Sequence, residues 1–381
     1  MTRATVWAAA ALALAAAGCQ RLKPGDPIPG LTRAERERFK QGKVVFDSVF
    51  TPQTGLGPLF NSIACGECHE DPVAGGSGDE VEVHASVLRA GLCDPLAGEG
   101  GPVIQQATTP ALKQALGIDR EPFPPSAPVR ASRTSPVVFG RGLLDAVPDS
   151  VFLRYADPDD ADRDGISGRP NRFFDGRIGR LGRKALVPTL DEFNAGAFVL
   201  EQGITNPAVR TEETIGGQPI PEGVDPTPDP EINQEALDLT NAFMRFLAAP
   251  TPTRAGTEGK RGRAVFSEIG CAACHIPTLR TGDHPVRALR NKQVAAYTDL
   301  LLHDMGPDLA DICLGLATSS EFRTEPLMGL RDAKRFLHDG RATTPEQAVE
   351  LHGGEAAAAR DRFKALPARD RAALIAFLKT L

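Results

Sequence analysis

The sequence predicts a mainly α protein made of two similar domains in tandem, with long loops around short helices. A Cys-x-x-Cys-His motif occurs once in each half of the 381-residue chain. Further landmarks follow both motifs in one order, and helix start signals and apolar helical stripes lie beside them. We place the domains at residues 31–250 and 255–381, after a leader at 1–19 and on either side of a Pro-Thr-Pro-Thr run at 250–253.

The length and charge of the chain narrow the class of protein. A chain of 381 residues can form two domains, each with its own core. There are 43 Lys and Arg residues against 49 Asp and Glu, a formal net charge of −6. Because nucleic-acid-binding proteins carry basic surfaces, we expect no nucleic-acid partner.

The N-terminus is typical of an export signal. Arg3 precedes an apolar run at 6–17, which is too short to span a bilayer as a helix. The run ends in Ala-Ala-Gly-Cys, which resembles a bacterial lipoprotein signal, although Leu is usual where Ala16 stands. Cys19 would then carry a lipid anchor, the only expected membrane contact. Alternatively, cleavage near Gly18 leaves Cys19 unmodified. Either way we expect the periplasm or cell envelope, with an outer-membrane lipoprotein as one form.

The two Cys-x-x-Cys-His motifs predict covalent haem c. The first comprises Cys65, Cys68 and His69, and the second comprises Cys271, Cys274 and His275. Two thiols on one turn of helix can both add to the haem vinyl groups, and the next imidazole binds the iron. A structural zinc site would need the second Cys pair about 15–20 residues away. Each half is therefore predicted to be a cytochrome c-like domain with one haem.

Two further cysteines lie outside the motifs. Cys93 and Cys313 stand in different halves of the chain. They could form a disulfide in an oxidising compartment, but their spacing does not decide it.

The two halves repeat one plan. The landmarks of the first half are Phe46, 133–137, 174–177 and 189–192, and those of the second are Phe266, 323–327, 338–341 and 344–347. A capping box at Thr32 predicts a helix through about Phe46. Thr344 followed by Pro predicts another helix, with Gly353 at its end. Apolar stripes at 239–247 and 374–381 predict two more helices that face the core.

The sixth position of each iron decides what the haem can do, because an open position binds small oxidants. His352 lies on the helix that begins at Thr344, and alignment of the halves places Ala197 at the equivalent position. The second haem is thus predicted to have two imidazoles and the first to lack the equivalent one. A surface role for His352 is the alternative. Met305 is a rival ligand for the second iron, and His84 could bind the first.

An acidic segment of the first half resembles the start of a calcium loop. Asp160, Asp162 and Asp164 stand at positions 1, 3 and 5, with Gly165 at position 6. Position 12 is Asn171 and not Glu, so a full EF-hand is absent. The alternatives are a bound Ca²⁺ and an acidic turn in solvent.

With these residues in view, the chain resembles the bacterial di-haem oxidoreductase family, whose members are described as peroxidase-like. The matching stretches are 140–149, 164–169, 297–307, 336–341 and 352–356. The chain is more distantly similar to di-haem cytochrome c peroxidases and to the methylamine dehydrogenase maturation enzyme. The resemblance implies that one haem handles peroxide while the other delivers electrons. It also implies that an iron ligand of the electron-transfer haem follows the second Asp-Gly-Arg landmark, as His352 does. Calcium between the domains is a third implication.

The chain departs from those relatives in two respects. They place a Trp between the haems, whereas this chain has only Trp7, in the leader, and is left with Tyr155 and Tyr297. They also hold an acidic residue over the peroxide-binding iron. Glu201 is the candidate by a loose match, and a surface or capping role is its alternative.

These observations predict a di-haem peroxidase-type oxidoreductase. The first haem would take a small oxidant such as hydrogen peroxide, and the second would receive electrons from an electron-donor protein or quinol-linked cytochrome. A di-haem electron-transfer cytochrome without turnover is the main alternative. An enzyme that oxidises a partner protein or an organic substrate is a third.

Overall fold

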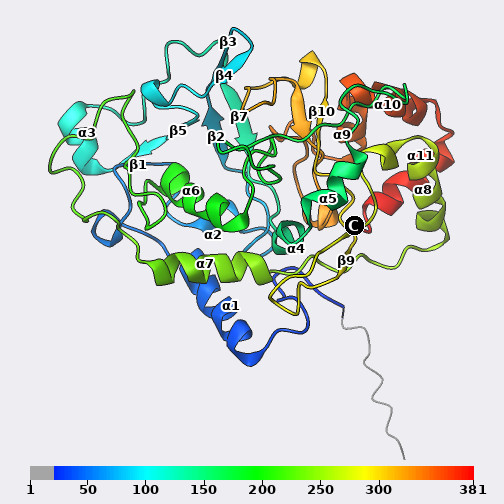
Figure 1. Ribbon diagram of the computed structural model, residues 1–381, viewed down its shortest axis with the longest axis horizontal. Coiled ribbons are helices and arrows are strands. Elements are labelled where there is room, and N and C mark those ends of the chain that lie inside the picture. Colours follow the sequence, from blue (N-terminus) through cyan, green and yellow to red (C-terminus); the bar gives the residue numbers. More distant parts are fainter. Residues whose placement is uncertain (1–20) are drawn as a thin grey trace, which may run out of the picture.

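The computed structural model describes residues 21–381, so the leader and Cys19 lie outside the described residues (Figure 1). The α-helices are α1 (Arg33–Phe46), α2 (Cys65–Cys68), α3 (Pro110–Leu116), α4 (Arg141–Asp145), α5 (Asp149–Phe152), α6 (Leu190–Gln202), α7 (Gln234–Phe246), α8 (Thr257–Glu268), α9 (Pro345–Leu351), α10 (Ala357–Ala365) and α11 (Ala368–Leu378). The strands are β1 (Leu59–Phe60), β2 (Val81–His84), β3 (Val87–Arg89), β4 (Leu92–Asp94), β5 (Val103–Ile104), β6 (Ala107–Thr108), β7 (Ala131–Thr134), β8 (Leu279–Arg280), β9 (Gln293–Val294), β10 (Leu302–Asp304) and β11 (Glu321–Arg323).

Each half contains one long helix pair with a glycine at the contact. In the first half α1 packs on α7, and Gly42 lies so close to the carbonyl oxygen of Leu239 that a Cβ atom would collide with it. In the second half α8 packs on α11, and Gly262 lies in the same way against the carbonyl of Ala373. Figure 1 shows the second pair at the right-hand end of the molecule. The same close approach therefore forms the core of both halves.

Aromatic residues connect each helix pair to the histidine of its motif. The ring of Phe46 lies 4.8 Å from that of Phe243 and 6.2 Å from that of His69. In the second half the ring of Phe266 lies 6.4 Å from that of His275 and packs on Phe377. These equivalent contacts place both motifs against the core of their own half.

The predicted helix starts are present. Thr32 caps α1 through a complete capping box with Glu35, and the Thr344 side chain accepts a hydrogen bond at the start of α9. The Asp-Gly-Arg landmarks are equivalent turns, in which Arg177 pairs with Asp175 and Arg341 pairs with Asp339. The repeat read from the sequence thus corresponds to repeated local structure, while the exact domain boundaries stay a prediction.

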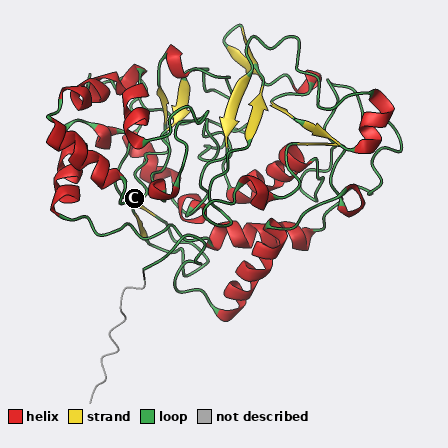
Figure 2. Ribbon diagram, turned by 180° about the vertical axis from the view of Figure 1, so that it is seen from behind, coloured by secondary structure: helices red, strands yellow, loops and turns green. Residues whose placement is uncertain are grey.

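Short sheets fill the space between the helix pairs, as Figure 2 shows. β2 is the central strand of an antiparallel sheet in the order β5-β2-β7, and β10 pairs with β11 in the second half. Helices account for 33% of the structure and strands for 12%. The expectation of a mainly α protein is therefore met only in part, because loops hold most of the chain. No helix among residues 21–381 has the length and apolarity needed to cross a membrane.

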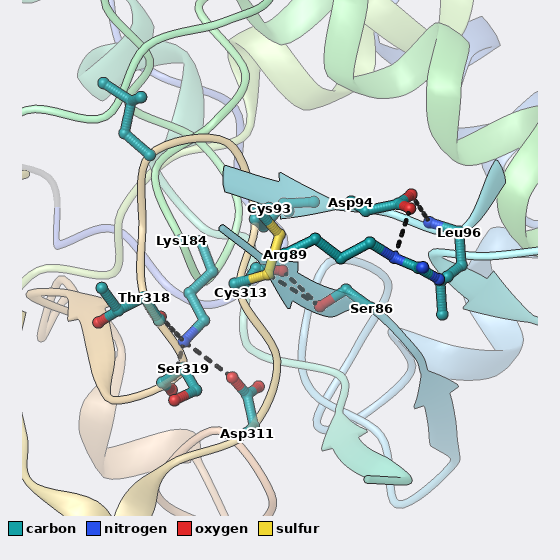
Figure 3. The surroundings of a disulfide bond; sticks show 12 residues. Ser86, Arg89, Cys93, Asp94, Leu96, Lys184, Asp311, Cys313, Thr318 and Ser319 are labelled. Carbon is teal, nitrogen blue, oxygen red and sulfur yellow. Dashed lines mark hydrogen bonds and ion pairs between the residues drawn. A yellow bond between two sulfur atoms is a disulfide. The ribbon is translucent and has the colours of Figure 1, made fainter. Parts of the chain in front are cut away.

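A disulfide joins the two halves. Cys93, on β4, is bonded to Cys313 in a loop of the second half, a separation of 220 residues (Figure 3). The hydroxyl of Ser86 donates a hydrogen bond to the carbonyl of Cys313 at 2.9 Å. The pairing that the sequence left open is thus present, and it fixes the β3–β4 hairpin to the second half.

Candidate functional site

The motif histidines are oriented by backbone carbonyls. Nδ1 of His69 lies 3.1 Å from the carbonyl oxygen of Gly76, and Nδ1 of His275 lies 2.9 Å from that of Tyr297. Burial lowers the pKa of both imidazoles, to about 4 for His275. A neutral imidazole that donates its Nδ1 hydrogen in this way presents Nε2 as a metal ligand. Both histidines therefore fit the role of an iron ligand.

The four motif thiols are half-buried and outside any disulfide. Burial is the main cause that raises the pKa of Cys65, Cys68 and Cys271 to about 12. A structural zinc site joins four ligands, and among residues 21–381 no group of clustered metal-ligating side chains contains both thiols of either motif. The residues fit covalent links to a haem better than a zinc site.

His352 has the same orientation as the motif histidines. It ends α9, and its Nδ1 lies 2.7 Å from the carbonyl oxygen of Ala348. Burial lowers the pKa of His275, and the nearby imidazole of His352 lowers it further. The structure therefore brings the two histidines into one neighbourhood, with Nε2 of each available.

Met305 lies on the adjoining segment. Its carbonyl oxygen packs against Gly353, the residue after His352, and its side chain is half-buried. Both candidates for the sixth position of the second iron are thus beside the second motif, and the choice between them stays a prediction.

We expect the substitution His352→Gly to convert one low-spin ferric haem to high spin, because the sixth ligand is lost. EPR of the purified holoprotein measures the change. His284→Gly is the matched control, since His284 is half-buried and its Nδ1 accepts a hydrogen bond from the backbone of Val286. An unchanged spectrum for His352→Gly would remove the ligand assignment.

Glu201 lies beside the first motif, near the C-terminal end of α6. Its Oε2 accepts a hydrogen bond from Nδ2 of Asn61 at 3.0 Å. Burial raises the pKa of Glu201 well above its usual value, and the charge of Glu82 adds to this. The charge of Glu201 in turn contributes to the raised pKa of Cys65, after burial. A carboxyl group that favours its protonated form more than an ordinary glutamate thus lies next to the site of the first haem.

Glu82, which sequence reasoning missed, is the second acidic residue at this site. Its Oε2 lies 3.0 Å from Nε2 of His84, two residues along β2. Although burial pushes the pKa of Glu82 upward, the hydrogen bond from His84 and the charge of Arg133 bring it below its usual range. Residues i and i+2 of a strand share a face, so the Glu-x-His pattern was a usable signal. This contact occupies Nε2 of His84, whose role as an iron ligand stays a prediction.

A buried imidazolium lies beside the second motif. Nε2 of His303 lies 2.8 Å from Oδ2 of Asp299, and Nδ1 lies 2.7 Å from Oε2 of Glu355. Burial opposes the charge, but these hydrogen bonds raise the pKa of His303 to about 12. Nδ1 also lies 3.7 Å from Sγ of Cys274. Sequence reasoning missed this cluster, because Glu355 comes from a segment 52 residues beyond the Asp299–His303 pair and only the fold brings it there.

The acidic turn of the first half gathers a different trio from the predicted one. Oxygens of Asp157, Asp160 and Asp162 lie within 4.8 Å of one another, whereas Oδ1 of Asp164 accepts a hydrogen bond from the backbone of Ile166. Asp157 thus joins Asp160 and Asp162, and the role of Asp164 stays a prediction. Calcium binding by this turn stays a prediction.

Four carboxylates gather at a second acidic cluster, formed by Glu212, Asp225, Asp229 and Glu231, whose oxygens lie within 4.8 Å of one another. Burial and then the charge of Glu231 raise the pKa of Glu212 to about 9. Burial is also the main cause that raises the pKa of Glu231 to about 8. Ionising this cluster is therefore unfavourable in the folded state.

The cluster predicts a pH-dependent stability. A carboxyl whose folded pKa lies above its unfolded value contributes stability at low pH, which is lost as the pH rises through the folded value. We expect Glu212→Gln to be more stable than the parent by about 1–2 kcal/mol at pH 9, after discounting for partial exposure, and no more stable at pH 4. Denaturant unfolding in a chelator measures this. The exposed Glu222→Gln is the control, and equal gains at both pH values would contradict the expectation.

Fold and site together define a di-haem protein, because each half presents two thiols and a carbonyl-anchored histidine beside its own core. A family model described as "Di-haem oxidoreductase, putative peroxidase" matches residues 128–381. The chain belongs to this family of di-haem oxidoreductases. The family assignment expected from the sequence is confirmed.

Several solved structures are similar at low identity. The chain is 17% identical to the diheme peroxidase BthA from Burkholderia thailandensis, covering 94% of this chain and 87% of that one at a TM-score of 0.43. A MauG-like protein associated with microbial copper homeostasis is 15% identical, with 94% of each chain covered and a TM-score of 0.41. Hydrazine synthase from Kuenenia stuttgartiensis is 14% identical, with 100% and 99% covered and a TM-score of 0.41. No curated protein matches the chain. The family assignment therefore rests on the family model.

Proposed function

We propose that the protein is a di-haem c peroxidase-type oxidoreductase in which the first haem receives the oxidant and the second delivers electrons. The two haems are attached through the thiols of the two motifs, with His69 and His275 as iron ligands. When bound, the haems supply the redox chemistry, and the chain supplies ligation, proton placement and exclusion of water. The observation that carries this proposal is the unequal surroundings of the two motifs.

At the second motif the chain offers a second imidazole. His352 is held by a carbonyl in the manner of His275, and two imidazoles suit a haem that only transfers electrons. In the first half the equivalent position is Ala197, on α6, which offers no ligand atom. This difference supports an open sixth position at the first haem.

At the first motif the chain offers an acid and a base. Environments that push two pKa values apart mark the donor and the acceptor of a proton. Burial shifts Glu201 towards its protonated form, and because Asn61 donates to Oε2, Oε1 is the oxygen left to carry the proton. Glu82 is ionised and can accept a proton. The pair can therefore take a proton from one oxygen of hydrogen peroxide and give one to the other.

We infer that the protein works in the periplasm or cell envelope, reduced by an electron-donor protein or a quinol-linked cytochrome. The disulfide between Cys93 and Cys313 supports an oxidising compartment. Anchoring through Cys19 remains part of this proposal, and mass spectrometry of the mature N-terminus tests it. A free or cleaved N-terminus without lipid would contradict the anchor.

The deciding experiment combines three measurements on the holoprotein. We expect the mass of the polypeptide plus two haems, one high-spin and one low-spin ferric signal by EPR, and turnover of hydrogen peroxide with a reduced cytochrome donor. Two low-spin haems that exclude cyanide would instead identify an electron-transfer cytochrome. An open site with poor turnover of a cytochrome donor would indicate oxidation of another substrate.

A further inference from the structure

Three arginines surround one carboxylate at the boundary between the halves. Glu325 accepts hydrogen bonds from Arg141 and Arg323, both at 2.6 Å, and an oxygen of Glu325 lies 3.5 Å from a nitrogen of Arg183. Arg141 and Arg183 come from the first half, whereas Arg323 and Glu325 come from the second. We call the three arginines and Glu325 the arginine cage.

The donors of the arginine cage are only partly used. The side chains of Arg141 and Arg323 are 8% and 3% exposed, yet Nη1 of Arg141 and Nε of Arg323 are buried without a hydrogen-bond partner. A buried guanidinium donor without an acceptor keeps the full cost of its lost hydration. Two such donors in one cage indicate that an acceptor belongs there.

Charge counting indicates what the acceptor is. Three guanidinium groups face a single carboxylate, so the arginine cage holds two excess positive charges. The neighbouring cations Arg133 and Lys184 are matched in number by Asp311 and Glu82, so they leave the excess unchanged. Buried charges need opposite charges, and the guanidinium fork suits carboxylates. A group with two carboxylates would balance the cage.

The arginine cage lies next to the first motif. Nη2 of Arg141 donates a hydrogen bond to the carbonyl of Val137 at 2.9 Å. The next residue, Val138, donates its amide to the carbonyl of Gly75, whose own amide donates to the carbonyl of His69. Arg183 donates a hydrogen bond to the carbonyl of Thr134, on the strand β7 that pairs with β2, where Glu82 stands. A haem carries two propionate carboxylates, which matches the excess charge of the cage in number and chemistry.

We propose that Arg141, Arg183 and Arg323 bind the propionates of the haem held by the first motif, and that this haem thereby ties the two halves of the protein together. This rests on the proposed attachment of a haem to the first motif. It also assigns Arg323, from the second half, to the haem of the first. The second half is then needed for the first haem to be held in place.

The test compares Arg323→Gln with the conservative Arg323→Lys in the protein with both haems. Loss of a positive charge disfavours electron uptake, so Arg323→Gln should make the reduction potential of one haem more negative and lower the midpoint of thermal unfolding by several degrees. Arg323→Lys should retain most of both values. A potential that Arg323→Gln leaves unchanged would overturn the proposal. If Arg323→Gln does not fold, Arg141→Gln replaces it, with the same expected pattern.

Two single-haem backgrounds identify which haem is bound. In the variant Cys271→Ala/Cys274→Ala, which keeps the first haem, Arg323→Gln should still lower the unfolding midpoint. In Cys65→Ala/Cys68→Ala, the same change should leave it unchanged or raise it, because an unbalanced charge is removed. Equal effects in both backgrounds would overturn the proposal. Haem content by mass, measured on the same samples, separates this outcome from a failure of haem attachment itself.

Discussion

Replacing Glu201 by Gln is expected to reduce peroxide turnover by about 10²–10⁴-fold, the usual contribution of a positioned acid–base group. Gln keeps the shape of the side chain and its contact with Asn61 but cannot donate a proton from Oε1. Because the pKa of Glu201 lies well above its usual value, the parent should lose activity as the pH rises through that pKa, and the variant should not show this step. Steady-state turnover across pH measures both effects.

Two control measurements make this result interpretable. The exposed Glu222→Gln should leave turnover unchanged. Haem content and spin state should be the same in Glu201→Gln as in the parent, because Glu201 is not a ligand. Full activity of Glu201→Gln with an unaltered pH profile would exclude Glu201 as the proton donor. Loss of activity accompanied by loss of haem would instead point to a structural role.

The local patterns of the sequence predicted the helical parts of the fold. The capping signals at Thr32 and Thr344 and the apolar stripes depend only on neighbours in the chain, and α1, α7, α9 and α11 form where they indicate. The short sheets were not predicted, because strands of two to four residues, such as β2, carry too few alternating positions to read. Their pairing with distant segments forms through tertiary contacts that no local pattern encodes.

The candidate site, like the fold, was predicted from the sequence only where local patterns define it. The motif residues follow from spacing alone, whereas Glu82 and His303 gain their significance from partners that the fold brings to them. Glu325 illustrates this point, since its three arginines come from positions 141, 183 and 323. The Arg-Thr-Glu-Pro landmark that contains Glu325 was recognised as a repeat, but its cross-half contacts depend on how the two halves pack.

Lys184→Met is expected to destabilise the protein by about 3–5 kcal/mol, the cost of removing one partner from a buried ionic cluster. The side chain of Lys184 is fully buried, and its Nζ lies 2.8 Å from Oδ1 of Asp311 (Figure 3). Nζ also donates hydrogen bonds to the carbonyl oxygens of Thr318, Ser319 and Glu321, at 3.1, 2.9 and 2.7 Å. Met fills a similar volume but leaves the three carbonyl oxygens without this donor and Asp311 without this opposite charge.

Lys184 comes from the first half and its acceptors come from the second. Loss of the Lys184 contacts should therefore also weaken the interface between the two halves. Denaturant unfolding measures the stability, and proteolysis measures the opening of the 311–321 segment. Lys40→Met is the control, since the Lys40 side chain is 72% exposed on α1. The disulfide at Cys313 limits how far that segment can move, so the double variant Cys93→Ser/Lys184→Met should be cleaved faster than either single variant. Stability equal to that of the Lys40→Met control would show that the Lys184 contacts do not help to hold the halves together.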